Sequence, residues 1–498
     1  MTLQVTTGRH QRTALKRVAT LMAMSLWGTF LGASDVLASD WDRFRGPNGT
    51  GISPDPDPLP TTFSESENLQ WKVALPGAGV SCPIIVGEKV FVTCYSGYGL
   101  DRQDPGKIED LKRHLVCLDR TTGKTLWEKT VAAVLPEDYF SGMGVPEHGY
   151  ASHTPTSDGK NVYVFFGKSG VFAYDLDGNQ LWQTSVGKES DDREWGSSSS
   201  PIVTGDVVVV VAGPESRAIV GLDKATGKEL WRADSDGLGS VWGTPVLAKI
   251  DDSRTDVVLG APNEIWGLNP ATGKLKWYCE AMATDQFNSS VVVADSKIYA
   301  VEGGRPGREG GSIAIKTGGK GDITKTDVVW SGKDNNRFST PLLYEGRMYL
   351  ISGSIARCVN AANDEEIFKG RLEGSGAAPA NDAPGGPPGG RPGGRPGQEN
   401  GGQPGGQPPR EQGGGRGGFG GGGPGGSGYS SPVLGDGKIY YVTRGGDIHV
   451  IKPTDTFEKL ATNRVTAESE DFSATPAISA GQIFFRSNKH LYCVSLQK

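Results

Sequence analysis

The stretch Asp223-Lys224-Ala225-Thr226-Gly227-Lys228-Glu229-Leu230-Trp231 decides the fold of this chain, because copies of it recur along the sequence. Short apolar alternation lies before it in residues 219–222 and after it up to Trp231, which predicts two strands joined across a tight turn. Gly227 can supply the positive φ of that turn, and the Asp223 carboxylate can accept hydrogen bonds from its N–H groups. Each copy is therefore a hairpin whose indole can be buried only against a neighbouring unit.

Further copies occupy residues 119–127 and 269–277, and a copy shortened by one residue occupies 175–182. A second hairpin precedes each copy, as in residues 200–210, so the repeating unit has four strands. The units are spaced mostly at about 45 residues, the period of a propeller blade. Eight units open at Pro83, Pro155, Pro201, Pro245, Ser290 in place of proline, Pro341, Pro432 and Pro476.

These repeats predict an all-β fold, an eight-bladed β-propeller of four-stranded antiparallel blades. The indoles expected to dock one blade on the next are Trp71, Trp127, Trp182, Trp231, Trp277 and Trp330. Although the chain has 498 residues, stacked repeats share one continuous core, so we expect a single domain. The net charge of −6, with both signs interspersed, gives no indication of a nucleic-acid or anionic-membrane partner.

The first 38 residues predict a signal peptide. Basic residues between Arg9 and Arg17 precede an apolar run from Val18 to Ala33, and small residues ending at Ala38 offer a cleavage site. The run is shorter than the ~20 residues of a membrane-spanning helix. We therefore expect cleavage after Ala38, a mature chain without a transmembrane segment, and a periplasmic or secreted location.

Residues 39–67 are rich in Pro and Asp and predict an extended lead-in to the propeller, which itself spans 68–372 and 429–498. The strand Leu69–Val73 carries an outer-strand Trp but follows no repeat, whereas the last repeat ends at Val494 without an outer strand. We predict that the first strand completes the last blade and closes the ring, which removes an exposed sheet edge. Residues 373–428 are almost entirely Gly, Pro, Gln and Arg, a composition that predicts a disordered insert.

The longer connections fall mainly on one face of the predicted ring, which usually marks the working face of a repeat fold. Aromatic residues on that face stand just before the innermost strands, where they could either line the mouth of the central channel and stack on a ligand or pack between blades. These candidate binding residues are Tyr150, Trp195, Trp242, Phe287, Phe338, Tyr429 and Phe472.

No catalytic constellation emerges from the sequence. His148 and His153 are weak candidates for metal ligands, since no third ligand is spaced to join them. A calcium-loop-like start at residues 175–179 lacks its later acidic ligand and is interpreted as a turn. The six cysteines are scattered; a disulfide between Cys82 and Cys94 is one interpretation, and buried strand positions for most of them are the other.

The Asp-x-x-Thr-Gly-Lys-x-x-Trp motif at 119–127 and 223–231, its Asn variant at 269–277 and the Pro-led inner strands resemble the repeat of the pyrroloquinoline quinone (PQQ) dehydrogenase-like propellers. The resemblance covers about residues 68–497 apart from the Gly-rich insert. That family includes quinoprotein dehydrogenases and also BamB-like propellers, which bind no quinone and serve as periplasmic scaffolds. The adjacent Cys-Cys pair, the CxxCH haem motif and the calcium-binding Glu and Asn of the dehydrogenases find no match here, so the chain is more similar to the BamB-like members. It also lacks the lipidated Cys of BamB.

Three functions are consistent with this reading. The preferred one is an exported scaffold that binds protein partners or other extracellular ligands through the insertion-rich face and has no enzymatic activity. The alternatives are a quinoprotein oxidoreductase that uses PQQ with Ca²⁺ through divergent ligands, and a carbohydrate-binding propeller that uses the aromatic face.

Overall fold

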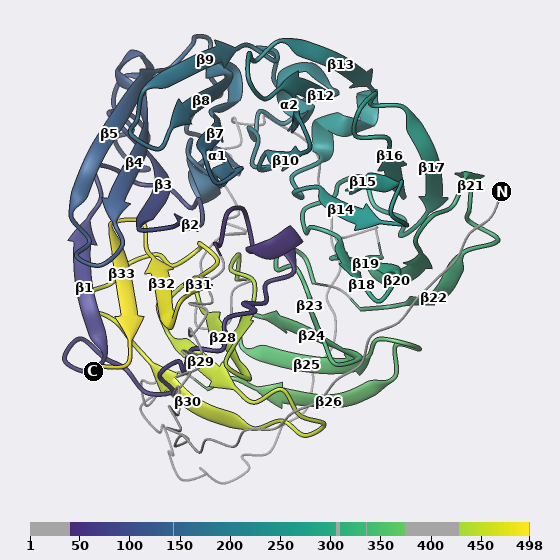
Figure 1. The fold of residues 1–498 in the computed structure, drawn as a ribbon. Helices are drawn as coiled ribbons and strands as arrows, with labels where there is room; N and C mark the ends of the chain where they lie inside the picture. The colour runs from purple at the N-terminus through teal and green to yellow at the C-terminus, as the bar shows by residue number, and fades with distance from the viewer. Residues whose placement is uncertain (1–39, 143, 305–308, 335, 374–427, 498) are drawn as a thin grey trace, which may run out of the picture. The chain divides into compact units, whose positions relative to one another are not determined.

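The computed structural model describes residues 40–142, 144–304, 309–334, 336–373 and 428–497, which lie within one compact unit that begins at Ala38. Eight sheets are arranged in a ring about a common axis (Figure 1). Within each sheet four strands run antiparallel to their neighbours from the axis to the outside, and blade 4 adds a fifth strand, β21, parallel to β17. The predicted eight-bladed propeller is therefore confirmed.

The strands of blades 1 to 4 have the following bounds. Blade 1 contains β2 (Ile84–Val86), β3 (Lys89–Ser96), β4 (Lys112–Asp119) and β5 (Thr125–Ala132). Blade 2 contains β6 (Thr156–Ser157), β7 (Asn161–Phe165), β8 (Val171–Asp175) and β9 (Gln180–Thr184). Blade 3 contains β10 (Ile202–Thr204), β11 (Val207–Ala212), β12 (Ala218–Asp223) and β13 (Glu229–Asp234). Blade 4 contains β14 (Val246–Lys249), β15 (Thr255–Ala261), β16 (Glu264–Leu268), β17 (Leu275–Glu280) and a fifth strand, β21 (Gly321–Asp322).

Blades 5 to 8 complete the ring. Blade 5 contains β18 (Val292–Ala294), β19 (Lys297–Glu302), β20 (Gly311–Lys316) and β22 (Val328–Gly332). Blade 6 contains β23 (Leu342–Tyr344), β24 (Arg347–Ser352), β25 (Ile355–Asn360) and β26 (Glu366–Arg371). Blade 7 contains β27 (Val433–Gly435), β28 (Lys438–Val442), β29 (Ile448–Ile451) and β30 (Lys459–Asn463). Blade 8 contains β31 (Ala477–Ser479), β32 (Gln482–Arg486), β33 (His490–Ser495) and β1 (Leu69–Ala74).

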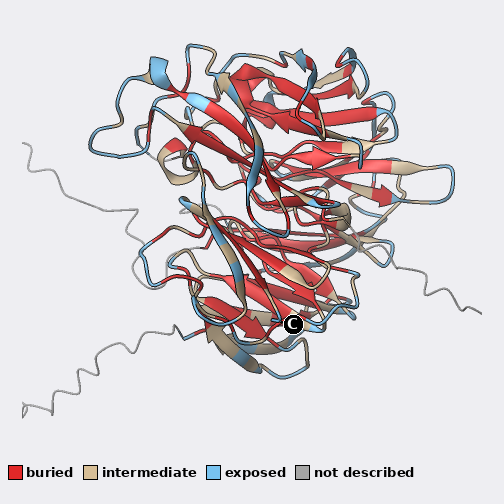
Figure 2. Ribbon diagram, turned by 60° about the vertical axis from the view of Figure 1, so that its left-hand side comes forward, coloured by how far each residue is buried: buried red, intermediate tan, exposed pale blue. Residues whose placement is uncertain are grey.

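The ring closes where the two ends of the propeller share blade 8. β1 pairs antiparallel with β33, and Trp71 lies opposite Cys493. This pairing confirms the predicted closure. The apolar cluster at the closure combines side chains of blades 7, 8 and 1, such as Val450, Phe484 and Val92, so the closing strand lies on a continuous core. Figure 2 shows that exposed residues gather in the connections, whereas the strands are largely buried.

The tryptophans at the repeat ends connect consecutive blades. Five of the indole N–H groups donate to a carbonyl oxygen in the turn before the outer strand of the following blade, at 2.9–3.1 Å. The pairs are Trp71 with Arg120, Trp127 with Leu176, Trp182 with Lys224, Trp231 with Pro270, and Trp330 with Ala361. Trp277 differs and donates to Asp256 Oδ2 at 2.9 Å, since the corresponding connection of blade 5 is longer and adds β21 beside β17. Each indole thus has its polar atom satisfied while its rings are packed between blades.

Every outer strand contains a β-bulge at the residue just before the docking position. In blades 1 to 3 the bulged residues are Leu126, Leu181 and Leu230, and 46 to 48% of each side chain is exposed. A bulge in an edge strand increases its twist and interrupts the regular row of backbone N–H and C=O groups that could pair with another strand. The exposed leucines of the outer wall are therefore part of the repeat geometry and do not by themselves mark a binding patch.

A closed belt of hydrogen bonds surrounds the axis. In each blade the backbone N–H of one residue donates to the side chain of the equivalent residue in the next blade, at 2.9–3.0 Å for seven of the eight bonds. The members are Cys82, Thr154, Ser200, Thr244, Ser290, Thr340, Ser431 and Thr475. The belt satisfies donors that the innermost strand of a sheet cannot pair within its own blade.

The belt corrects one detail of the repeat alignment. Its members directly precede the proline that opens each repeat, and in blade 5 the member is Ser290. Val291 therefore takes the proline position there. The expectation that Ser290 itself replaces the proline is wrong by one residue.

Residues 40–63 of the lead-in cross the axis of the ring. Ser157 of blade 2 donates its N–H to Asp42 O, and Arg45 donates to Pro341 O beside blade 6 at 2.9 Å. Blades 2 and 6 lie on opposite sides of an eight-membered ring, so the segment spans it, as the purple stretch in the middle of Figure 1 shows. The short helix η1 (Pro47–Gly49) lies on the way, and Asn48 exchanges two hydrogen bonds with Leu247 of blade 4.

The lead-in lies at the end of the axis formed by the turns between first and second strands, here called the turn face. Asp40 accepts from Gly87 N, Asp55 from Ala480 N, and Asp436 accepts from Leu59 N. The opposite end, formed by the connections between second and third strands and between consecutive blades, is called the loop face. The predicted signal peptide (1–38) lies outside the described residues, as does the predicted disordered insert apart from its ends (374–427).

Candidate binding face

The loop face carries five of the six short helices of the described chain: η2 (Ile108–Asp110), α1 (Val145–His148), η3 (Gly167–Ser169), α2 (Gly213–Ser216) and η4 (Asp236–Ser240). Two long segments of this face, residues 97–111 and 133–150 with residue 143 excepted, pack on each other and are called the crest. The crest has its own apolar cluster, centred on Tyr95, Tyr98 and Tyr150. This shared apolar cluster holds the two connections together.

Two buried ion pairs fix the base of the crest. Arg113 Nη2 lies 2.8 Å from Glu137 Oε1, and Lys168 Nζ lies 2.8 Å from Asp138 Oδ1. All four side chains are at most 5% exposed. Burial raises the pKa of Glu137 even though the guanidinium of Arg113 opposes the shift. Because removing one partner of a buried pair leaves an uncompensated charge, these pairs tie the crest to blades 1 and 2.

Three large apolar side chains of the crest point into solvent. Leu100 is 57% exposed, Leu135 46% and Tyr139 61%. Residues 97–100 and 139–140 adjoin, because the Phe140 N–H donates to Tyr98 Oη at 3.1 Å. The crest therefore offers exposed apolar side chains on a rigid base, a combination found at protein interaction sites.

The structure buries four of the seven aromatic candidates and leaves three half-buried. The buried residues are Tyr150, Trp242, Phe287 and Phe472. Trp195, Phe338 and Tyr429 remain half-buried. They do not form an open ring. Trp195 packs on Trp242 with ring centroids 5.8 Å apart, and Phe338 stacks on Tyr429 at 4.4 Å.

An arginine covers each of the three half-buried rings. Arg193 lies over Trp195 at 5.1 Å, Arg337 over Phe338 at 4.9 Å, and Arg444 over Tyr429 at 5.6 Å. Such guanidinium–ring contacts are cation–π interactions. The loop face thus presents flat aromatic groups and positive charge side by side.

Ion pairs also link non-neighbouring blades across the loop face. Glu147 of α1 accepts from Arg102 of blade 1 and, at 2.8 Å, from Arg444 of blade 7. Burial acts to raise the pKa of Glu147, but the two guanidinium groups outweigh it and the pKa lies below its ordinary value. Arg444 also contacts Asp471 at 2.6 Å. These contacts hold α1 toward the axis.

His153 is buried, His148 is half-buried, and both are bonded to other groups. His148 contacts Ser152 Oγ at 2.7 Å and Trp195 O at 2.8 Å, and His153 Nε2 lies 3.0 Å from Ser197 Oγ. Burial lowers the pKa values of both, that of His153 to about 3. They do not converge with a third ligand among the described residues, and the proposal of a metal at this pair has no support from their geometry.

A buried carboxyl group that sequence reasoning missed lies beside His153. Ser197 donates to Glu215 Oε1, and burial raises the pKa of Glu215 to about 7. Ser197 lies between the carboxyl and the imidazole, so this arrangement differs from a catalytic triad, in which the imidazole is central. No sequence motif indicated the group, because Ser197 and Glu215 come from different connections of the loop face.

The cysteines are unpaired. All six lie buried in the described chain, and neither Cys82 nor Cys94 forms a disulfide.

The Asp175 turn is an Asx turn in which the carboxylate accepts from the N–H groups of Asp177 and Asn179.

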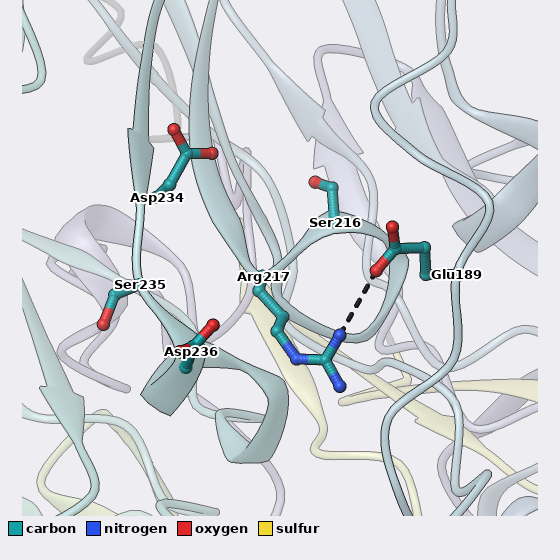
Figure 3. Close-up of a pocket in the computed structure, with 6 residues that line it drawn as sticks. All are labelled: Glu189, Ser216, Arg217, Asp234, Ser235 and Asp236. Carbon is teal, nitrogen blue, oxygen red and sulfur yellow. Dashed lines mark hydrogen bonds and ion pairs between the residues drawn. The ribbon is translucent and has the colours of Figure 1, made fainter.

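An open depression above blade 3 is lined by polar side chains (Figure 3). Arg217 pairs there with Glu189 at 3.2 Å and with Asp192 at 3.0 Å. The lining residues are Glu189, Ser216, Arg217, Asp234, Ser235 and Asp236. The depression lacks the apolar wall that small-molecule sites usually have.

The sequence matches the profile of one protein family. The profile of the family described as outer membrane protein assembly factor BamB matches residues 61–234, 111–305 and 215–363, which together span more than half of the chain. The chain belongs to this family. No curated protein matches the sequence.

Solved structures with a similar fold include a europium-containing methanol dehydrogenase, with a TM-score of 0.57 and 11% identity over 92% of this chain and 98% of that one. A quinohemoprotein alcohol dehydrogenase from Comamonas testosteroni has a TM-score of 0.54 and 12% identity over 92% and 80%. BamB from Moraxella catarrhalis has a TM-score of 0.49 and 12% identity over 86% and 99%. At these identities the likeness concerns the fold alone. Within the described residues, no helix has the length and apolar character needed to cross a bilayer.

Three acidic side chains of the loop face that could supply oxygen ligands to Ca²⁺ are already engaged in ion pairs. Calcium requires several oxygen ligands that converge on one point. Glu147, Asp285 and Asp471 are each paired with an arginine. The one described cluster of three potential metal ligands consists of Glu468, Glu470 and His490, and its Glu468 is paired with Lys72.

Proposed function

We propose that this protein is an exported scaffold that binds protein partners through the crest of its loop face. The observation that carries the proposal is the placement of Leu100, Leu135 and Tyr139, which are exposed on connections held by buried ion pairs. A rigid support lowers the entropy lost on binding, and exposed apolar groups provide the favourable burial. Membership in a family described as an outer membrane assembly factor supports a role in protein assembly.

Site-specific photo-crosslinking in the producing cell tests this proposal. A photoreactive residue replaces Leu100 or Tyr139 in separate variants, and matched controls carry it at Leu181 or Leu230, whose exposures are 47% and 48%. We expect one discrete crosslinked protein from the crest positions and none from the outer-wall positions. Equal crosslinking from both sets, or none from the crest, contradicts the proposal.

Export is the second part of the proposal. It rests on the charge and apolar pattern of residues 1–38, which predicts cleavage after Ala38. Cell fractionation followed by N-terminal sequencing of the mature protein tests it. A cytoplasmic protein that retains Met1 would contradict it.

The quinoprotein alternative has a separate test. Purified protein is incubated with PQQ and Ca²⁺, and the quinone absorbance is measured together with dye-linked oxidation of alcohols and sugars. Since Glu147, Asp285 and Asp471 of the loop face are paired with arginines, we expect neither signal. Stoichiometric quinone uptake with oxidation would replace the scaffold proposal by an oxidoreductase.

A further inference from the structure

Of the twenty buried side-chain polar atoms that lack a hydrogen-bond partner among the described residues, seven belong to five residues in connections of the loop face. Gln286 is 1% exposed and Asn336 3% exposed, and neither amide has a hydrogen-bond partner at its nitrogen or its oxygen among the described residues. Among the described Asn and Gln side chains, only these two are buried with both amide atoms unpaired. Three further atoms are buried without a hydrogen-bond partner: Arg193 Nη1, Arg337 Nε and Ser339 Oγ. A buried polar group left unpaired is strongly disfavoured, so this grouping requires an explanation.

These residues lie in connections that contact one another, and we call the set the polar arc. Arg193 Nη2 lies 3.3 Å from Asp285 Oδ2, next to Gln286 in the connection from blade 4 to blade 5. Asn288, two residues after Gln286, bonds to Glu302, which directly precedes Gly303. The backbone at Gly303 lies directly against Arg337, since a Cβ built there would be 2.5 Å from the Arg337 Cβ. The polar arc comprises Arg193, Gln286, Asn336, Arg337 and Ser339.

Aromatic rings flank the polar arc at both ends. Arg193 lies over the half-buried Trp195, and Arg337 lies over Phe338, which stacks on Tyr429. A ligand over the arc would therefore meet flat apolar surfaces beside hydrogen-bonding groups. This combination suits a molecule that has both apolar faces and many polar substituents.

The free atoms specify the ligand further. Each amide offers a donor and an acceptor, as Ser339 does through its hydroxyl, which matches the dual character of ligand hydroxyl groups. The guanidinium atoms add donors only, so donors exceed acceptors. The guanidinium of Arg337 acts on the buried Glu302, whose pKa burial raises to about 8. This carboxyl therefore does not neutralise Arg337 at pH 7, and the free charge favours a carboxylate on the ligand.

We propose that the polar arc binds an acidic saccharide, with sugar rings stacked on Trp195 and on the Phe338–Tyr429 pair, hydroxyl groups bonded to Gln286 and Asn336, and a carboxylate bonded to Arg337. Solvent does not reach the unpaired atoms, so the proposal requires the two amide side chains to turn outward when the ligand binds. The inference rests on a different part of the loop face from the crest. It is thus independent of the scaffold proposal.

Isothermal titration calorimetry on the full chain tests the proposal with three probes. Trigalacturonate carries rings and charge, its methyl ester carries the rings without charge, and citrate carries charge without rings. We expect binding of trigalacturonate, at least tenfold weaker binding of the ester, and no binding of citrate. Failure to bind trigalacturonate at millimolar concentration, equal binding of the ester, or equal binding of citrate overturns the proposal.

Variants test the assigned residues. Asn336→Leu and Gln286→Leu should each weaken trigalacturonate binding at least tenfold, and both should raise the Tm of the free protein, since each removes a buried unpaired amide. Gln70→Leu on the outer strand β1 is the matched control, because Gln70 is exposed and should alter binding less than twofold. Unchanged binding in the two loop-face variants contradicts the assignment, and the Tm measurement separates loss of binding from loss of folding.

Discussion

The backbone N–H of Thr475 donates to the Sγ of Cys82 at 3.2 Å, and this contact completes the belt of eight hydrogen bonds around the propeller axis. The other seven acceptors are hydroxyl groups, so Cys82 is the single sulfur member. Sulfur is a weak hydrogen-bond acceptor. Cys82 lies where the last blade meets the first. The belt and the shared sheet of blade 8 thus close the ring at two radii.

Cys82→Ala should lower the free energy of unfolding by about 1 to 3 kcal/mol relative to Cys82→Ser, because only serine retains an acceptor for the buried Thr475 N–H. Urea denaturation of the two variants measures the difference. Cys117 in β4 has no belt contact, so Ala and Ser at that position provide the control pair. Equal stabilities of the two Cys82 variants would show that the contact contributes nothing.

Trp71→Ala should destabilise the protein by about 3 kcal/mol, since it removes indole packing and a hydrogen bond to Arg120 at the ring closure. Gln70→Ala, at the exposed neighbouring bulge, should change stability by less than about 0.5 kcal/mol. Thermal unfolding of both variants checks this. Similar Tm values would argue that β1 does not hold the ring together.

Gly46→Ala should weaken the lead-in far more than Gly87→Ala. Both glycines have positive φ, 65° and 54°, so both variants carry the backbone strain of about 1–2 kcal/mol. Only at Gly46 would the new Cβ lie 2.5 Å from the Trp41 ring, whereas nothing lies within 4 Å at Gly87. Limited proteolysis of residues 40–63 measures the release of the lead-in, and equal cleavage rates would contradict its close packing.

Asp138→Asn should cost about 3 to 5 kcal/mol, because it leaves the buried ammonium of Lys168 without its counter-ion. Glu229→Gln breaks the more exposed pair with Arg232 and should cost no more than about 1 kcal/mol. Hydrogen exchange should show faster exchange in residues 133–150 for the first variant alone. Unaltered hydrogen exchange in residues 133–150 would contradict a role of the Asp138–Lys168 ion pair in supporting the crest.

Glu215→Gln should become progressively more stable than the wild-type protein as pH rises from about 4.5 to 7. Burial raises the pKa of Glu215 from 4.5 to about 7, so the folded state retains a proton that the unfolded state releases in this window. The stability advantage of the protonated carboxyl is present below pH 4.5 and is lost as pH rises through 7, on the order of 3 kcal/mol in total. His153 acts in the opposite sense, because the stability that its neutral imidazole contributes is lost as pH falls from 6.5 toward 3. This contribution is the same in Glu215→Gln and in the wild-type protein, so it cancels in the difference between them. Urea denaturation across this range measures the difference, and a pH-independent difference would contradict the shift.

Local sequence patterns predicted the blades because turn chemistry and strand alternation act over a few residues. The motif ending at Trp231 indicated a hairpin and the need for a neighbour, and the missing outer strand after Val494 indicated its partner at Trp71. The belt was within reach of the same reasoning, since a hydroxyl-bearing residue precedes almost every repeat proline, but its role depends on contacts between blades. The candidate site was less predictable, because Gln286 and Asn336 belong to connections without a repeating pattern.

The sequence by itself determined an eight-bladed ring closed by its two ends, since periodic apolar hairpins can bury their faces only against copies of themselves. Only the tertiary structure decided that the lead-in crosses the axis, that four of the seven aromatic candidates are buried, and that unpaired amides gather beside the remaining three. Those features depend on which connections meet above the sheets. Contacts between segments up to hundreds of residues apart are set by the ring as a whole, and no local pattern encodes them.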